Sequence, residues 1–178
     1  PSYEAVKLLP DIIGEYELTK IELPTVFGRA AEIMTAKIEE IRPDAVICVG
    51  QAGGRRGITP EVIGINLREA SIADNAGAQP QNEPVRVGAP DGIFSTLPVR
   101  EMVEAIKAEG LPALLSFSAG AFVCNDLLYS LLYQFKDTNI KIGFIHVPFL
   151  PEQAKENVPS MTLNEIVLAL TKCIEALK

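Results

Sequence analysis

Short, uninterrupted runs of apolar residues alternate with helical patterns along this chain, and this alternation limits the folds that it can adopt. The clearest run is Asp44-Ala-Val-Ile-Cys-Val-Gly50, and two more lie at 113–118 and 142–146. A run that is apolar at nearly every position predicts a strand buried on both faces, as in a parallel sheet. Residues 62–67 and the partly alternating 15–26 are weaker strand candidates.

Amphipathic helical patterns fill most of the chain between these candidates. We expect helices at about 2–9, 27–41, 98–109, 122–135 and 163–177. The last begins with Thr162-Leu-Asn-Glu165, a capping box that satisfies the first backbone N–H groups of a helix. Strands that alternate with helices predict an α/β fold: a single-domain three-layer α/β/α sandwich with a mostly parallel or mixed twisted sheet.

One long segment, 71–95, has no clear period and is rich in Asn, Asp, Gln, Gly and Pro. Loops of this length in a domain of this size are usually functional or form arms between subunits. We therefore expect this segment to cover the site or to make a subunit contact.

The composition argues against several functional classes. The 178 residues carry a formal net charge of −7, which disfavours nucleic acid and anionic membranes as partners. No apolar run reaches the roughly 18 residues that a membrane helix needs. Three cysteines without paired spacing favour a reducing, cytoplasmic location, and Cys48 and Cys173 lie on apolar patterns typical of packing residues. One histidine without an HExxH pattern argues against a catalytic zinc site.

Candidate reactive side chains lie at or near the carboxyl ends of predicted strands, where open α/β sheets bind ligands. Cys124 falls in the first turn of a predicted helix, where unpaired N–H groups favour a thiolate. His146, the only histidine, ends a strand and could take the proton of that thiol and return it to a leaving amine. Glu61, in the loop Ile58-Thr-Pro-Glu61, could orient the imidazole as the third group of a triad.

Each of these residues also has a purely structural interpretation. Cys124 could be a small buried residue at a strand–helix junction, His146 an inert hydrogen-bonded histidine, and Glu61 a solvated surface carboxylate. The glycine-rich loop 50–57 could cradle phosphate or bring backbone close to a small ligand. It lacks the GxxxxGK[ST] and GxGxxG spacings of nucleotide-binding loops.

A series of motifs occurs in one order from Pro1 to about residue 175. They are Gly50-Gln-Ala-Gly-Gly-Arg55, Ile58-Thr-Pro-Glu61, Ile65-Asn66, Asp74-Asn75, Ser95-Thr-Leu-Pro98, Ser118-Ala-Gly-Ala-Phe-Val-Cys-Asn125 and Gly143-Phe-Ile-His-Val-Pro148. Together they resemble the pyroglutamyl-peptidase I (pyrrolidone-carboxylate peptidase) family of cysteine peptidases. The resemblance implies an exopeptidase that removes an N-terminal pyroglutamyl (5-oxoprolyl) residue from peptides through an acyl-enzyme, without metal or organic cofactor.

The resemblance also assigns roles by motif. It implies a triad of Cys124 as nucleophile, His146 as general acid and base, and Glu61 as the orienting carboxylate. It further implies a fold similar to that of nucleoside phosphorylases and assembly as a homotetramer.

A pyroglutamate pocket is implied at Gln51, Phe122 and Val123, with backbone groups that read the lactam. A lactam has one N–H and one C=O, so a fitted pocket needs one acceptor and one donor between apolar walls.

Two features depart from the family pattern. The family begins with a strand and a turn of the Gly-Phe-x-Pro-Phe-Gly type, and this sequence starts just after that segment, so we expect one peptidase domain over 1–178 that lacks it. Where the family usually reads Ala-Arg-Ile-Pro-Asp-Asn, this chain has Ala70-Ser-Ile-Ala-Asp-Asn75. Ser71 cannot supply a guanidinium, and strand alternation points Arg68 to the opposite face.

Three functions are therefore compatible with the sequence. The first is an active thiol exopeptidase specific for pyroglutamate. The second is a catalytically impaired pyroglutamyl-binding protein on the same fold. The resemblance implies that the family arginine at the position of Ser71 helps to hold the oxyanion, and loss of an oxyanion donor slows such enzymes by roughly 10²–10³. The third is phosphate-dependent nucleoside chemistry, which rests only on fold similarity and the glycine loop.

Overall fold

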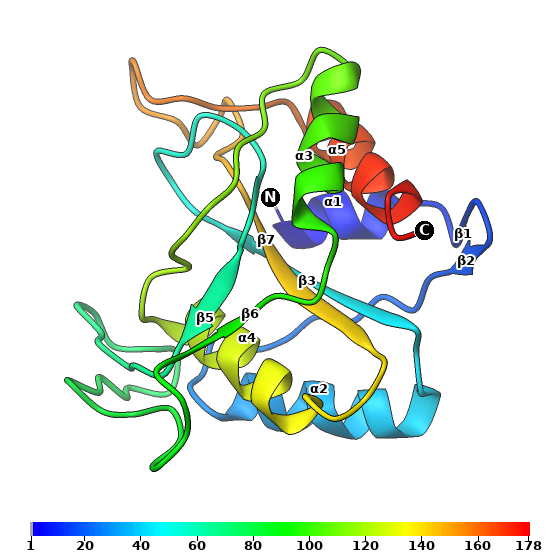
Figure 1. Cartoon of the computed structure of the whole chain (residues 1–178). Helices are drawn as coiled ribbons and strands as arrows, with labels where there is room; N and C mark the ends of the chain where they lie inside the picture. Colours follow the sequence, from blue (N-terminus) through cyan, green and yellow to red (C-terminus); the bar gives the residue numbers. More distant parts are fainter. Residues whose placement is uncertain (1) are drawn as a thin grey trace.

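Two of the apolar runs form neighbouring parallel strands, β3 (Ala45–Gln51) and β7 (Lys141–Val147), at the centre of the molecule (Figure 1). The computed structural model describes residues 2–178. β4 (Thr59–Pro60) pairs with the other edge of β7 in the antiparallel direction, so this sheet is mixed, with the order β3-β7-β4. The remaining strands pair separately: β1 (Ile12–Ile13) with β2 (Tyr16–Glu17), and β5 (Ile63–Ile65) with β6 (Gly92–Phe94).

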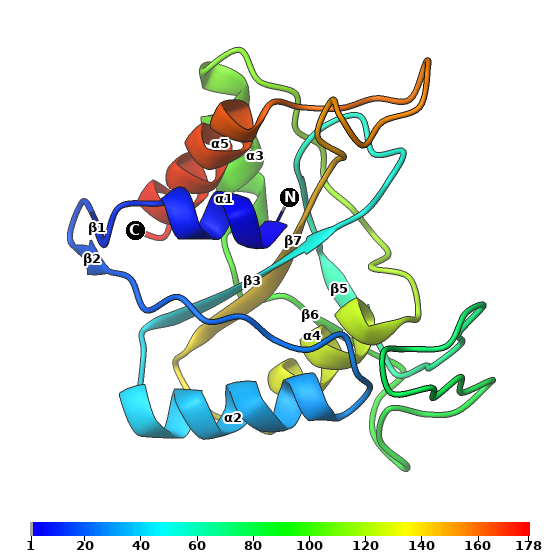
Figure 2. The ribbon, with the colours of Figure 1, turned by 180° about the vertical axis from the view of Figure 1, so that it is seen from behind.

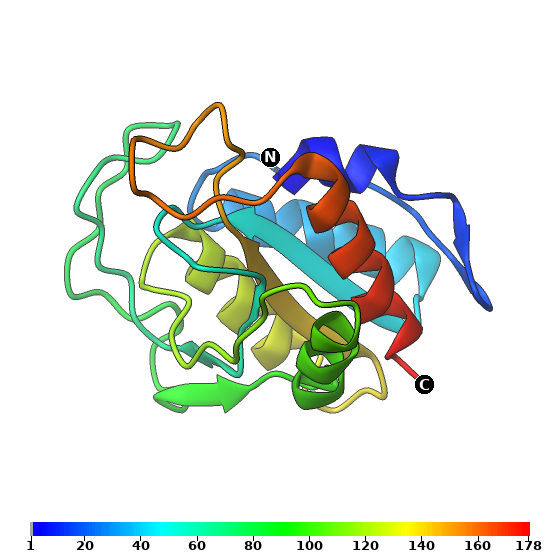
Figure 3. The same cartoon turned by 90° about the horizontal axis from the view of Figure 1, so that it is seen from above.

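Helices cover both faces of β3 and β7. They are α1 (Ser2–Leu8), α2 (Arg29–Ile41), α3 (Val99–Ala108), α4 (Val123–Gln134) and α5 (Leu163–Glu175). α1, α3 and α5 lie on one face, and α2 and α4 lie on the other (Figures 1 and 2). In Figure 3, the view passes α3 and α5 before it reaches the two strands. The predicted α/β/α layering is confirmed.

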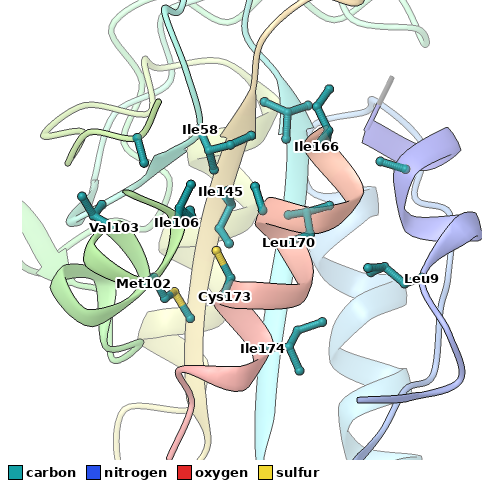
Figure 4. Close-up of a cluster of buried hydrophobic side chains, with 14 of the residues drawn as sticks. Leu9, Ile58, Met102, Val103, Ile106, Ile145, Ile166, Leu170, Cys173 and Ile174 are labelled. Atoms are coloured by element: carbon teal, nitrogen blue, oxygen red, sulfur yellow. The ribbon is translucent and has the colours of Figure 1, made fainter. Parts of the chain in front are cut away.

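Each side of the sheet has its own apolar core. Figure 4 shows the core beneath α1, α3 and α5, where Ile145 of β7 faces Ile106 and Leu170. The opposite core joins β3 and β7 to α2 and α4 through side chains that include Val46, Leu128 and Phe144. Because strand side chains alternate between faces, both cores draw on the same two strands.

The capping box predicted at the start of α5 is confirmed. The Thr162 hydroxyl accepts from the Glu165 backbone N–H, and the Glu165 carboxylate accepts from the Thr162 backbone N–H at 2.7 Å. This reciprocal pair fixes where the final helix begins.

Several strand predictions were wrong. Residues 113–118 form no regular buried strand: they make isolated bridges from Ala113 to Ile58 and from Ser116 to Glu61, and Leu114 and Phe117 are exposed. Within 15–26, only β2 is a strand. Conversely, β4 lies in a segment that reads as loop, because its two residues are held by β7 rather than by any pattern of their own.

The loop predicted at 71–95 is a pair of extended arms that project from the body beside β5 and β6, in green at the lower left of Figure 1. Its last part is not loop, because Gly92–Phe94 forms β6. Its base is tied to the body: Asp74 accepts from the Phe27 N–H at 2.9 Å, and the Asn75 N–H donates to the Thr25 carbonyl. The bond from Phe27, together with bonds from the Ala76 and Ala78 N–H groups, lowers the pKa of the Asp74 carboxyl group.

A cavity of about 490 Å³ runs along the edge of β3 that faces away from β7. Its walls come from β3, from residues 15–21, and from parts of α1, α2 and α5. Across residues 2–178, no helix combines the length and apolar character needed to span a membrane.

Candidate active site

His146 and Glu61 form a buried hydrogen-bonded pair at the carboxyl end of β7. The Nδ1 atom of His146 lies 2.7 Å from Oε1 of Glu61, and both side chains are almost completely shielded from solvent. The strands explain this proximity, because Thr59 pairs with His146 and Glu61 follows directly after β4. A further backbone bond, from the Glu61 N–H to the Phe144 carbonyl, holds the glutamate beside β7.

This pairing determines which ring nitrogen is left for chemistry. Since Nδ1 is engaged by Glu61, Nε2 of His146 is the nitrogen that remains to exchange a proton with another group. A carboxylate bonded to Nδ1 fixes the tautomer and orientation of an imidazole and stabilises its protonated form. The structural alternative of a solvated surface glutamate is therefore wrong for Glu61.

Cys124 reaches the same end of the sheet from α4. It is the second residue of α4 and its side chain is partly buried. A Cβ placed on Gly50 would lie only 3.2 Å from the Cys124 sulfur. Gly50 is the register partner of His146, so the thiol rests over the sheet beside the residue that carries the imidazole. The same Cβ would collide with the Phe144 ring at 2.7 Å, so glycine is required here chiefly by that ring, and a larger residue would also crowd the sulfur.

The thiol itself is not poised as a thiolate. Burial raises the pKa of Cys124 to about 11, and the negative charge of Glu61 adds to that rise. The hydrogen bond from its own backbone N–H acts in the opposite direction and is the smaller influence. The sequence expectation that the helix N-terminus favours a thiolate is thus outweighed by desolvation.

Arg55 is a component of this site that the sequence predictions missed. One guanidinium nitrogen lies 3.2 Å from Glu61 Oε1 and donates to the Ser118 carbonyl at 3.1 Å, and the other donates to the Ser116 hydroxyl at 2.8 Å. The sequence did contain a hint of this role, because a carboxylate that acts inside a buried site needs a cation nearby to offset its charge. Arg55 stands only six residues before Glu61.

The glycine-rich loop has structural reasons for its glycines. A Cβ at Gly53 would collide with the Phe149 ring, and one at Gly57 would collide with the Pro112 carbonyl. Gly54 has a φ of +81°, a conformation that other residues rarely adopt. Arg55 is turned toward Glu61, so its guanidinium is not available to bind a phosphate.

The residues expected to form a pocket gather near Cys124. Gln51 ends β3, Phe122 is the N-cap of α4, and Val123 is the first residue of that helix. The Phe122 ring packs edge-on against Phe27, with centroids 5.2 Å apart. The side chain of Val123 is buried in the core beneath α4, so only its backbone is available to a ligand.

Ser71 and Arg68 take different positions around this region. Ser71 is exposed on the arm. The Nε atom of Arg68 donates to Oδ1 of the buried Asp126 at 2.6 Å, and its guanidinium lies 5.9 Å from the Phe27 ring centroid. Asp126 lies on α4 and also accepts from the Gly28 N–H. Arg68 closely precedes the 71–95 arms, so its bond to Asp126 ties their base to the helix that carries Cys124.

The other two cysteines behave as predicted. Cys48 and Cys173 are buried in the apolar cores, and burial raises the pKa of each thiol to about 12. Within the part of the chain that the structure describes, no group of three or more His, Cys, Asp or Glu side chains is arranged to hold a metal ion.

Comparisons with known proteins identify the family of this chain. The family model described as pyroglutamyl peptidase matches residues 1–178. The pyrrolidone-carboxylate peptidase of Streptococcus pneumoniae (strain 70585) is 48% identical over 99% of this chain and 85% of its own length. The same protein of Staphylococcus saprophyticus is also 48% identical, with the same coverage.

Solved structures give the same result. The crystal structure of pyroglutamyl peptidase I from Bacillus amyloliquefaciens is 42% identical and superposes with a TM-score of 0.94, over 98% of this chain and 85% of that one. Pyrrolidone carboxyl peptidase from Thermococcus litoralis is 32% identical, with a TM-score of 0.93 over 99% and 86% of the two chains. On both sequence and structure, this chain belongs to the pyroglutamyl peptidase family.

Proposed function

We propose that this protein is a cysteine peptidase that hydrolyses the bond after an N-terminal pyroglutamyl residue. The observation that carries the proposal is the 2.7 Å bond between His146 Nδ1 and Glu61, beside a thiol seated over Gly50. Family membership supports the choice of substrate, because the relatives and solved structures are named as pyroglutamyl or pyrrolidone-carboxylate peptidases.

The reaction uses side chains and water alone. Nε2 of His146 takes the proton of Cys124 as the sulfur attacks the pyroglutamyl carbonyl carbon. The tetrahedral intermediate collapses, the C–N bond breaks, and the leaving amine receives that proton from His146. Water then attacks the thioester while His146 takes one of its protons. Pyroglutamate leaves, and the proton returns to the Cys124 sulfur.

The raised pKa of Cys124 determines whether its proton leaves before or during the attack on the substrate carbonyl. With a thiol pKa of about 11, the resting group is neutral at pH 7, so attack is coupled to proton removal by His146 rather than preceded by it. Inactivation by iodoacetamide should therefore accelerate steadily as pH rises from 6 to 10. A plateau already reached below pH 6 would instead reveal a preformed thiolate–imidazolium pair and would overturn this timing.

The first turn of α4 provides donors for the developing oxyanion. Backbone N–H groups at a helix start lack partners within the helix, and Cys124 is the second residue of α4. We assign the pyroglutamyl ring to Gln51, Phe122 and the Val123 backbone. Phe122 supplies an apolar wall, Gln51 offers both a donor and an acceptor, and the backbone reads the lactam.

Release of a fluorogenic amine from its pyroglutamyl amide, under reducing conditions, tests the proposal. We expect wild-type turnover that Cys124→Ala abolishes and that chelators leave unchanged. Stabilisation of the fold by pyroglutamate without any turnover would favour the impaired binding protein instead. Phosphate-dependent release of a base from a nucleoside, without cleavage of the amide, would favour the nucleoside chemistry.

The assembly state belongs to the same proposal. Phe94 and Phe117 are exposed on neighbouring segments, since β6 pairs with β5 and Val62 bonds to Ser116. Exposed apolar surface of this kind fits an interface between subunits, and we infer a homotetramer with the 71–95 arms near the contact. The three free cysteines fit a cytoplasmic location. Light scattering of the purified chain should give a mass near four protomers, and a monomer at micromolar concentration would contradict it.

A further inference from the structure

Arg55 contacts both halves of the site without lying among the reacting groups. On one side it pairs with Glu61 Oε1, the oxygen that also bonds to His146 Nδ1. On the other side it bonds to Ser116 and Ser118, which begin the turn that leads to Cys124. One planar guanidinium thus spans the segment that carries the glutamate and the segment that leads to the nucleophile.

The backbone already brings these two segments together. Ser116 donates its N–H to the Pro60 carbonyl and accepts from the Val62 N–H, so the stretches around Glu61 and Ser116 run side by side. The Ser116 hydroxyl in turn donates to the Ser118 carbonyl at 3.2 Å. Arg55 closes this arrangement, because its fork bonds to Ser116, Ser118 and Glu61 at once.

Charge gives Arg55 a second role. Glu61 is fully buried, and its Oε2 is the one buried side-chain oxygen or nitrogen without a hydrogen-bond partner in residues 2–178. A buried carboxylate without a cation is strongly disfavoured. When His146 is neutral, Arg55 is the cation beside Glu61. When His146 takes the thiol proton, two cations share one carboxylate oxygen.

We propose that Arg55 is a positioning residue that pairs with Glu61 and aligns it, holds the turn before Cys124 against it, and limits how tightly Glu61 binds a protonated His146. This assignment rests on the proposed peptidase function. Arg55 acts through Glu61 and the turn, and does not touch the substrate.

The neighbouring arginine offers a matched control. Arg56 is exposed, and its side chain makes no ion pair or hydrogen bond within the described part of the chain. Replacing it removes the same charge from the same loop without disturbing Glu61. The variants to compare are Arg55→Met, Arg55→Lys and Arg56→Met.

Turnover of a pyroglutamyl amide is the first measurement. We expect Arg55→Met to lower kcat about 100-fold while KM changes less than threefold, because displacement of catalytic groups by about 1 Å has effects of that size. Arg55→Lys should recover about tenfold, since it restores the charge but not the three-way fork. Arg56→Met should match wild type. An Arg55→Met enzyme within threefold of wild type would overturn the proposal.

The second measurement does not need activity, so it separates this inference from the proposed function. His146 is the only histidine, so its imidazole NMR signals need no assignment. The ionisable side chains around it are Glu61, which bonds to its Nδ1, Arg55, which pairs with the same Glu61 oxygen, and Cys124, which is close enough to Glu61 to be affected by its charge.

We expect Arg55→Met to move the midpoint of the His146 titration to higher pH by about half a unit or more. Without Arg55, the Glu61 carboxylate is no longer shared between two cations and stabilises the imidazolium more strongly. Arg56→Met should leave the midpoint in place. An unchanged midpoint in Arg55→Met would overturn the electrostatic role, even if wild type proved inactive. If Arg55→Met does not fold, Arg55→Gln removes the same charge and tests the midpoint, while Arg55→Lys tests turnover, because loss of the fork alone should lower kcat about tenfold.

Discussion

β3 and β7 both come from apolar runs and lie side by side, yet they have different surroundings. Each strand is seven residues long, and the two pair along their whole length. β7 is occupied on both edges: beyond β3, it bonds to Thr96, to Glu61 and to β4. β3 has only one partner strand, and the 490 Å³ cavity lies along its other edge.

The hydrogen bonds show which groups of β3 lack a strand partner. The Lys141 N–H donates to the Asp44 carbonyl and the Ala52 N–H to the Val147 carbonyl, so the even-numbered residues of β3 face β7. The N–H and C=O groups of Ala45, Ile47 and Val49 therefore point toward the cavity, since alternate residues of a parallel strand face opposite edges. His146, the proposed general base, lies on the strand that is paired on both edges.

The largest expected difference between the strands is functional. His146→Ala at the end of β7 should lower kcat/KM by about 10³–10⁴, because general acid and base catalysis is lost. Gln51→Ala at the end of β3 should cost only about tenfold, mainly in KM, because it removes a binding contact. Steady-state kinetics on a pyroglutamyl amide checks both values, and equal losses would mean that Gln51 does more than bind.

Core substitutions should separate the strands in stability. Ile145 of β7 is fully buried and Ile47 of β3 is only half-buried, although both face the core beneath α5. Ile145→Ala should lower the free energy of unfolding by about 3–4 kcal/mol, and Ile47→Ala by about 1–2 kcal/mol. Urea unfolding of both variants measures the difference. Equal losses would show that the open edge does not weaken packing on β3.

Alkaline pH should act on β3 through Cys48. Its pKa of about 12, against an unfolded value of 9.0, means that the folded state binds the thiol proton more tightly. The resulting stability is complete below pH 9 and is lost as pH rises toward 12. Cys48→Ala should reduce the loss between pH 9 and pH 11 by roughly 2–3 kcal/mol. Unfolding curves at both pH values test this, and a loss identical to that of wild type would contradict it.

The smallest expected effect concerns single backbone amides. The N–H groups of Ile47 and Val49 face the cavity, so they should exchange with solvent at least about tenfold faster than those of Gly143 and Ile145, which face β3. Hydrogen exchange followed by NMR in the chain of 178 residues gives these rates. Equally slow exchange would show that another group covers the open edge of β3 in solution.

The sequence predicted β3, β7 and the start of α5 because each has a local pattern: an uninterrupted apolar run, or a capping box. The segment 113–118 has the same kind of run but forms no regular strand, because only isolated backbone pairs hold it and Leu114 and Phe117 remain exposed. β4 was missed because two residues carry no periodicity. The apolar run alone therefore did not distinguish a paired strand from an exposed segment.

The candidate site divides in the same way. Cys124, His146 and Glu61 could be named from the order of elements and from a family resemblance, and the structure brings them to one end of the sheet. Arg55 could not be named, because its role depends on how a loop folds back onto a buried carboxylate. The direction of the Cys124 pKa shift could not be predicted either. Burial and the distant Glu61 raise this pKa, whereas the local helix N-terminus lowers it.

The uneven burial of the three cysteines makes the chain a reporter of its own folding. A thiol reagent meets only Cys124 in the native protein, whereas an unfolded molecule offers Cys48 and Cys173 as well. Counting labels by mass spectrometry therefore distinguishes native from unfolded copies one molecule at a time, without any added probe. The single label on a native copy would also mark the proposed nucleophile, so one experiment would measure both the folded fraction and the number of intact sites.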